Sequence, residues 1–122
     1  MFKFIALVAL CASVYSAQLQ SRPYALVKQE IGRGQTVMVE AGSTMCQSCQ
    51  EMGELLYREM EINPKRKIFF VNVGEERDAA RAMKIQMIPT QIVYDAQGRE
   101  IDRHIGGFTT DGLKRFLAKH KI

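Results

Sequence analysis

The chain has 122 residues, of which 47% are hydrophobic and 25% are charged. This length and composition are typical of one soluble domain and exclude a low-complexity disordered chain. We find no triplet, heptad or longer repeat in the sequence, which excludes collagen-like, coiled-coil and solenoid folds. The net charge of +4 is modest, and no basic stripe carries interleaved aromatic residues. We therefore expect no nucleic-acid binding.

Residues 1–16 have the pattern of a secretory signal peptide. Lys3 is followed by an uncharged run over residues 4–15, rich in apolar side chains, and small residues follow it. A short basic start and a short apolar run are typical of such a signal. Because a membrane-spanning helix needs about 20 apolar residues, the run is short for a permanent anchor, which is the alternative. We expect cleavage after Ser16, a mature domain over residues 17–122, and a periplasmic or secreted location.

Removal of this segment changes the number of cysteines. Cys11 lies inside the predicted signal peptide, so the mature chain keeps only Cys46 and Cys49. A disulfide between two residues so close in sequence closes a very small loop and constrains the unfolded chain little. The pair is therefore predicted to serve chemistry rather than to staple the fold.

The first half of the mature chain alternates between helical and extended patterns. Pro23 suits the first turn of a helix, and the glycines after Ile31 end that helix. From Cys46 onward apolar residues recur at helical spacing, until Asn63-Pro64 ends the pattern. The elements expected here are a helix over residues 24–31, a strand over 36–39 that leads to Glu40, a loop over 41–44 and a helix from Cys46 to Asn63.

The second half contains three β-type runs and two helical ones. Residues 67–73 are nearly all apolar, which is typical of a strand covered on both faces. Residues 95–98 form a hairpin turn with glycine where a positive φ is needed, and Thr109 or Thr110 can cap the last helix. The elements expected here are strands over residues 67–73, 90–94 and 99–105, a charged helix over 75–84, and a final helix that buries Leu113, Phe116 and Leu117.

This order of elements predicts an α/β domain. We expect a mixed central sheet of about four strands, with helices on both faces. No internal linker divides the mature chain.

Cys46-Gln47-Ser48-Cys49 lies where a strand and its loop lead into the N-terminus of a helix. Free backbone N–H groups and the helix dipole stabilise an anion there, so we expect a lowered pKa for Cys46. A thiolate is the nucleophile of disulfide exchange, and a second thiol three residues later can resolve the mixed disulfide. We therefore predict that Cys46 reacts first and that Cys49 is shielded.

Two other interpretations of the cysteine pair stay open. The two side chains could be buried and purely structural. A structural zinc site would need two further ligands, and the histidines of the chain, His104 and His120, are far away in sequence. We expect no metal and no cofactor.

Four features together resemble the thioredoxin-like family, over nearly the whole mature chain from about Thr36. The first is the Cys-x-x-Cys motif after a strand. The second is Glu40, six residues before Cys46, where the family commonly has a buried aspartate. The third is Met87-Ile88-Pro89-Thr90, which is similar to the family's cis-proline loop. The fourth is Gly106-Gly107, where the family has a glycine beside the active site.

The resemblance implies a thioredoxin-like fold and three catalytic residues. Cys46 would attack a disulfide, Cys49 would resolve the mixed disulfide, and Glu40 would lie buried behind Cys49 and relay its proton. The alternative for Glu40 is an exposed carboxylate at the end of a strand.

The resemblance also implies a surface that binds the substrate. The backbone at Ile88 would pair with an extended substrate strand, and the Ile88–Pro89 bond would be cis. The alternative for Pro89 is an ordinary trans proline at a strand edge. The residues expected to contact substrate are Met45, Ile88, Pro89 and Gly106.

The chain departs from the family at several positions. Met45 replaces the usual tryptophan, Gln47-Ser48 replaces Gly-Pro, and Phe70 replaces the lysine that often pairs with the buried acid. The family's first strand has no clear counterpart, because the mature N-terminus is short. His104 alternates with isoleucines and is expected to be an exposed strand residue.

The leading functional hypothesis is an extracytoplasmic thiol–disulfide oxidoreductase that reduces protein disulfides as a monomer. The resemblance implies a membrane thiol transporter as its electron donor. A second hypothesis is a carrier of Cu(I) on Cys46, Cys49 and Met45, which are soft ligands. Copper carriers of this fold add a histidine near the cis-proline, and none lies between Gly74 and Tyr94. A third is a binding module without catalysis.

Overall fold

The computed structural model describes residues 17–122. The predicted signal peptide, residues 1–16, lies outside the described residues. The elements in chain order are α1 (Tyr24–Glu30), β1 (Val37–Gly42), α2 (Gln47–Ile62), β2 (Ile68–Asn72), α3 (Arg77–Ala82), β3 (Thr90–Tyr94), β4 (Glu100–Ile105) and α4 (Thr110–Lys119).

The four strands form one mixed sheet in the order β2-β1-β3-β4. β1 runs parallel to β2 and antiparallel to β3, and β4 returns antiparallel to β3. Gly98 has a φ of 87° in the hairpin turn between β3 and β4, as the sequence predicted. The predicted α/β class and strand number are confirmed.

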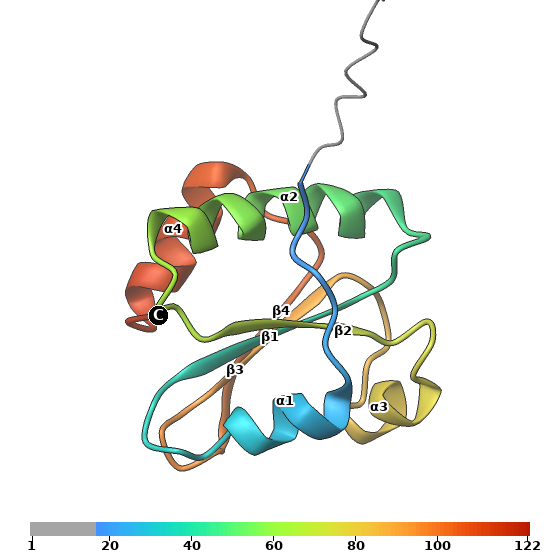
Figure 1. Ribbon diagram of the computed structural model, residues 1–122, viewed down its shortest axis with the longest axis horizontal. Helices are drawn as coiled ribbons and strands as arrows, with labels where there is room; N and C mark the ends of the chain where they lie inside the picture. Colours follow the sequence, from blue (N-terminus) through green and yellow to red (C-terminus); the bar gives the residue numbers. More distant parts are fainter. Residues whose placement is uncertain (1–16) are drawn as a thin grey trace, which may run out of the picture.

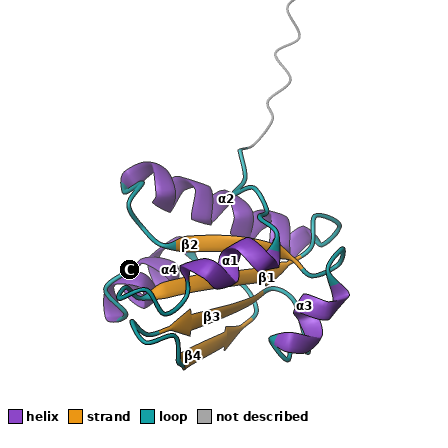
Figure 2. Cartoon of the chain, turned by 60° about the horizontal axis from the view of Figure 1, so that its bottom comes forward, coloured by secondary structure: helices purple, strands orange, loops and turns teal. Residues whose placement is uncertain are grey.

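Helices cover both faces of the sheet: α2 and α4 lie on one side, and α1 and α3 lie on the other (Figures 1 and 2). Alternate residues of β1 point to opposite faces. Val37, Val39 and Ala41 join the core under α1 and α3, whereas Met38 packs with Met52 of α2 under the other pair of helices. None of the helices in residues 17–122 is long and apolar enough to cross a membrane.

β1 is longer than predicted and places Glu40 inside the sheet. The expected loop over residues 41–44 begins only at Ser43, because Ala41 and Gly42 continue the parallel pairing with β2. Glu40 pairs with Phe70 on one side and with Gln91 on the other. On the face that carries Met38, a carboxyl group therefore takes a position where an apolar side chain is the usual choice.

The predicted helix over residues 75–84 is shorter in the structure, where α3 spans Arg77–Ala82. The amides of Glu75 and Glu76 both donate to the carbonyl of Asn72, at 3.2 and 3.0 Å, which makes a turn before the helix. Ala79 and the C-cap residue Met83 are buried and attach this helix to the core.

Residues 19–22, before α1, lie next to β2 and partly replace the family's first strand. Ser21 forms a single parallel bridge with Phe70 at the free edge of β2, and the Arg22 amide donates to the Phe70 carbonyl at 2.8 Å. The Leu19 amide donates to the carbonyl of Gly53 in α2 at 3.0 Å. This segment therefore ties the edge of the sheet to α2 and closes the space between them.

Candidate active site

Cys46 is the N-cap residue of α2. Its Sγ accepts a hydrogen bond from the Cys49 amide at 3.3 Å and lies 3.3 Å from the Ser48 hydroxyl. Partial burial raises the pKa of this thiol, but hydrogen bonding by Cys49 and Ser48 outweighs burial and holds the pKa below its ordinary value. Cys46 is half-buried, so a partner can reach the sulfur that is easiest to ionise.

Cys49, one turn further along the helix, is buried, with 6% of its surface exposed. The pKa of the Cys49 thiol is raised to about 12, mainly by burial and also by hydrogen bonding to Cys46 and by the nearby Cys46 and Glu40 charges, while a backbone hydrogen bond from Ser43 lowers it in part. Gly42 of β1 makes room for this side chain, because a Cβ at that position would lie 3.3 Å from both the Cβ and the Sγ of Cys49.

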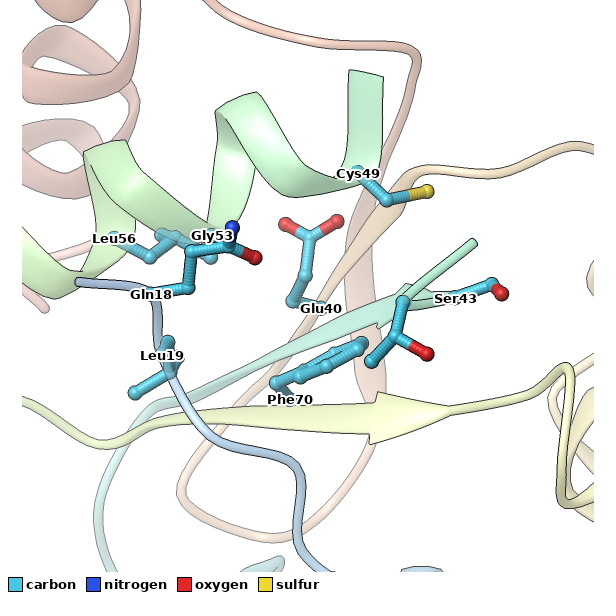
Figure 3. A pocket seen from close by; sticks show the side chains of 9 residues that line it. Gln18, Leu19, Glu40, Ser43, Cys49, Gly53, Leu56 and Phe70 are labelled. Carbon is cyan, nitrogen blue, oxygen red and sulfur yellow. The ribbon is translucent and has the colours of Figure 1, made fainter. Parts of the chain in front are cut away.

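Glu40 points from β1 towards α2, at the level of Cys49 and Gly53 (Figure 3). Only 2% of its surface is exposed, so the alternative of an exposed strand-end carboxylate is wrong. The pKa of Glu40 is raised to about 8: burial raises it most, the charge of Cys46 raises it further, and the hydrogen bond that the Gln91 amide donates lowers it in part. The structure thus brings Glu40, Cys46 and Cys49 together.

A small cavity connects the Glu40 carboxyl group with Cys49 (Figure 3). It has room for about one water molecule. The residues that line it are Gln18, Leu19, Glu40, Ser43, Thr44, Cys49, Gly53, Leu56 and Phe70.

The loop before β3 lies at the same end of the strands as the connection from β1 to α2. Thr90, the first residue of β3, pairs with Ala41 of β1 and with Ile105 at the end of β4. The Ile88–Pro89 peptide bond is cis, and the carbonyl of Pro89 accepts a hydrogen bond from the Gly106 amide at 2.8 Å. Pro89 and Gly106 are therefore direct neighbours.

Two of the residues expected to contact substrate differ in exposure. Met45, next to Cys46, has 91% of its surface exposed, whereas Ile88 is half-buried. Gly106 has a φ of 101°, in the left-handed region where a side chain is strained. Met87 adds a second exposed methionine to this edge, with 64% of its surface exposed.

Two residues next to the site were not predicted correctly. The sequence did not single out Gln91, which contacts Glu40, and the prediction that His104 is exposed was wrong. Gln91 is fully buried and donates from Nε2 to both carboxylate oxygens of Glu40, at 3.2 and 3.1 Å. His104 is half-buried rather than exposed, and its Nδ1 lies 2.6 Å from Oε1 of Gln91. Its ring stacks on Phe108 at 3.8 Å between centroids, which covers part of the ring. The available signal was a glutamine next to the apolar residues 92–94 in a predicted strand.

Within residues 17–122, no three His, Cys, Asp or Glu side chains gather as a metal site would require.

The chain matches a family model, described as a thioredoxin-like domain, over residues 25–121. No curated protein is similar enough in sequence to count as a relative. Among solved structures, a thioredoxin from Malassezia sympodialis is 25% identical, with a TM-score of 0.70 over 88% of this chain and 92% of that one.

Two further structures show the same fold at lower identity. A thioredoxin from Nicotiana alata is 20% identical, with a TM-score of 0.73 over 89% of this chain and 97% of its own. A mutant thioredoxin from Halobacterium salinarum is 16% identical, with a TM-score of 0.73 over 88% of this chain and 93% of its own. The family match covers most of the chain and the fold agrees with it, and on this basis the protein belongs to the thioredoxin-like family.

Proposed function

We propose that the protein is an extracytoplasmic thiol–disulfide oxidoreductase that reduces protein disulfides with Cys46 and Cys49. The observation that carries this proposal is the pairing of two unlike thiols above a buried acid. Cys46 is half-buried with a lowered pKa, and Cys49 is buried with a pKa raised to about 12. One sulfur is thus ready to attack, and the other is held back until its proton is removed.

The reaction runs in two exchanges. The Cys46 thiolate attacks one sulfur of the partner's disulfide, which forms a mixed disulfide and releases the first partner thiolate. Cys49 then loses its proton, and its sulfur attacks the Sγ of Cys46. This step forms the Cys46–Cys49 disulfide and releases the second partner thiolate. The partner gains two electrons, which the two cysteines lose.

Glu40 is the group placed to take the proton of Cys49, directly or across the small cavity between them. With a pKa of about 8, roughly one tenth of Glu40 is ionised at neutral pH. Each ionised Glu40 can accept the Cys49 proton, and the protonated form can return a proton to a leaving thiolate. A group that titrates close to the working pH serves both directions of exchange.

The partner is an extended segment of a protein that carries a disulfide. It would lie along the edge formed by Met45, the Ile88–Pro89 loop and Gly106. Met45 supplies exposed apolar surface next to Cys46, and the backbone of Ile88 supplies hydrogen bonds to an added strand. The protein acts as a monomer after removal of residues 1–16, and a membrane thiol transporter returns electrons to it.

Reduction of insulin by dithiothreitol, with and without the mature protein, tests the activity. We expect the wild type to accelerate reduction, Cys46→Ser to lose the acceleration, and Cys49→Ser to accumulate a mixed disulfide that mass spectrometry detects. A wild type that gives no acceleration, or a Cys46→Ser variant that matches it, would contradict the proposal. Fusion of residues 1–16 to a reporter that is active only outside the cytoplasm tests the location.

A further inference from the structure

Four residues form one row across the sheet: Phe70 on β2, Glu40 on β1, Gln91 on β3 and His104 on β4. Each is the direct cross-strand partner of the next. Directly opposed residues of neighbouring strands point to the same face, so the four side chains stand side by side under α2 and α4. The row extends the polar site from Glu40 to the far edge strand.

The hydrogen bonds within the row show which polar atoms donate and which accept. Nε2 of Gln91 donates to the Glu40 carboxyl oxygens, which leaves Oε1 of Gln91 facing Nδ1 of His104 at 2.6 Å. An amide oxygen only accepts, so Nδ1 of His104 carries a hydrogen. The neutral Nδ1–H form and the charged form of histidine both meet this requirement.

His104 thereby fixes which way the Gln91 amide points. When Glu40 is ionised, turning the amide over would place Oε1 against the carboxylate and the NH2 group against the Nδ1–H of His104, which opposes two acceptors and two donors. Gln91 is fully buried, so water does not replace the lost partners. The stack of His104 on Phe108, with 18° between the ring planes, holds the imidazole in place.

We propose that Gln91 and His104 are positioning residues, which hold the Glu40 carboxyl group in place to accept the proton of Cys49. Within the proposed function, on which this role rests, the S–H bond of Cys49 breaks and an O–H bond forms on Glu40. Gln91 stabilises the carboxylate by donating to it before the transfer. His104 acts one residue further away, by holding the amide of Gln91.

The other groups that face Glu40 do not offer the same support. Cys46 and Cys49, from the start of α2, interact unfavourably with its charge, and Cys49 also shares the small cavity. β2 presents the ring of Phe70, and the segment before α1 presents the neutral side chain of Gln18. Among residues 17–122, Gln91 is the side chain that donates a hydrogen bond to the carboxylate.

The test follows the ionisation of Glu40 itself by carboxyl carbon NMR, in the reduced mature protein. Its resonance is the one missing from Glu40→Gln. Gln91→Leu removes the donor at similar volume, and His104→Phe removes the second donor while an aromatic ring stays on Phe108. His120→Phe is the matched control, because His120 packs on Phe116, which also lies 6.1 Å from the His104 ring, but forms its hydrogen bond with Asp102 at 2.7 Å rather than with a residue of the row.

We expect the midpoint of the Glu40 titration to rise by about 1 pH unit in Gln91→Leu, the size of one hydrogen bond to a charged group. His104→Phe is expected to give a smaller rise, and His120→Phe none. Unchanged midpoints in both row variants, with melting temperatures that show folded protein, would overturn the proposal. A shift in Gln91→Leu alone would remove His104 from it, and an equal shift in His120→Phe would show a general effect of packing.

Kinetics separate this role from the proposed function. The rate at which Cys49 resolves a mixed disulfide should reach half of its maximum at a higher pH in both row variants. In a Glu40→Gln background the same two changes should have no further effect on the pH profile. If the wild type reduces no disulfide, the proposed function fails while the NMR titration still decides the positioning role. Normal activity with unchanged Glu40 midpoints would support the proposed function and overturn the positioning role.

Discussion

Replacement of Glu40 by glutamine tests how much the ionisation of Glu40 lowers the free energy of unfolding. Burial raises the pKa of Glu40 from 4.5 to about 8 in the folded protein, whereas the unfolded chain keeps the ordinary value. Between these two pH values the folded protein binds more protons than the unfolded chain. The free energy of unfolding of the wild type therefore falls as the pH rises through this window, and levels off above about pH 8.

The expected size follows from the difference between the two pKa values. At ~1.36 kcal/mol per pKa unit, the full effect is on the order of 5 kcal/mol, and about 3 to 4 kcal/mol of it falls between pH 5 and pH 8. Glu40→Gln has no titrating group at this position, so its free energy of unfolding does not fall by this amount. Its free energy of unfolding, taken relative to the wild type, should therefore rise by about 3 to 4 kcal/mol from pH 5 to pH 8.

Urea unfolding followed by far-ultraviolet circular dichroism measures this difference, since the chain has no tryptophan to report by fluorescence. Both proteins are kept reduced and compared at several pH values between 5 and 8. Glu59→Gln is the matched control, because Glu59 is equally buried but its charge is compensated by Arg66 and Lys114. The control is not expected to reproduce the rise. Parallel curves for wild type and Glu40→Gln would refute the reasoning, since Glu40 would then ionise as freely in the fold as outside it.

Three further outcomes are expected. Limiting iodoacetamide should alkylate Cys46 before Cys49 in the reduced protein, and mass mapping that finds Cys49 labelled first would reverse the two roles. Gly42→Ala should lower stability by about 1 to 3 kcal/mol in urea unfolding, because the new methyl group would lie 3.3 Å from Cys49 and 3.4 Å from Phe70. The redox potential, measured in glutathione buffers, should lie nearer to about −270 mV than to about −120 mV, because the neutral Gln47-Ser48 pair stabilises a thiolate only weakly. A value above about −180 mV would make the protein an oxidase or an isomerase.

The order of the elements was predictable because each has a clear periodic pattern. The helix after Cys46 repeats its apolar residues at helical spacing, and Met52 and Leu56 are indeed buried. Thr109 caps the last helix by accepting a hydrogen bond from the Gly112 amide at 3.0 Å, as the sequence suggested. These features depend on neighbours within a few positions along the chain, which a sequence displays directly.

The environment of Glu40 was harder to predict because it depends on strand register. The residues around it lie 30 and 51 positions further along the chain, at Phe70 and Gln91, and are brought together only by pairing across β1, β2 and β3. The sequence showed His104 in an alternating strand, where the usual expectation is exposure. Its contact with Gln91 and its stack on Phe108 follow from the position of β4 and the loop after it.

Phe70 and Gln91 together explain why Glu40 titrates near the working pH. A cation next to a buried carboxyl group would lower its pKa, and a lysine at the position of Phe70 would supply one. The ring of Phe70 supplies none and helps to keep the carboxyl group from water. On the other side Gln91 offers hydrogen bonds without a charge, which offset the cost of burial only in part. The balance leaves the pKa at about 8, where Glu40 can both take the proton of Cys49 and give one back.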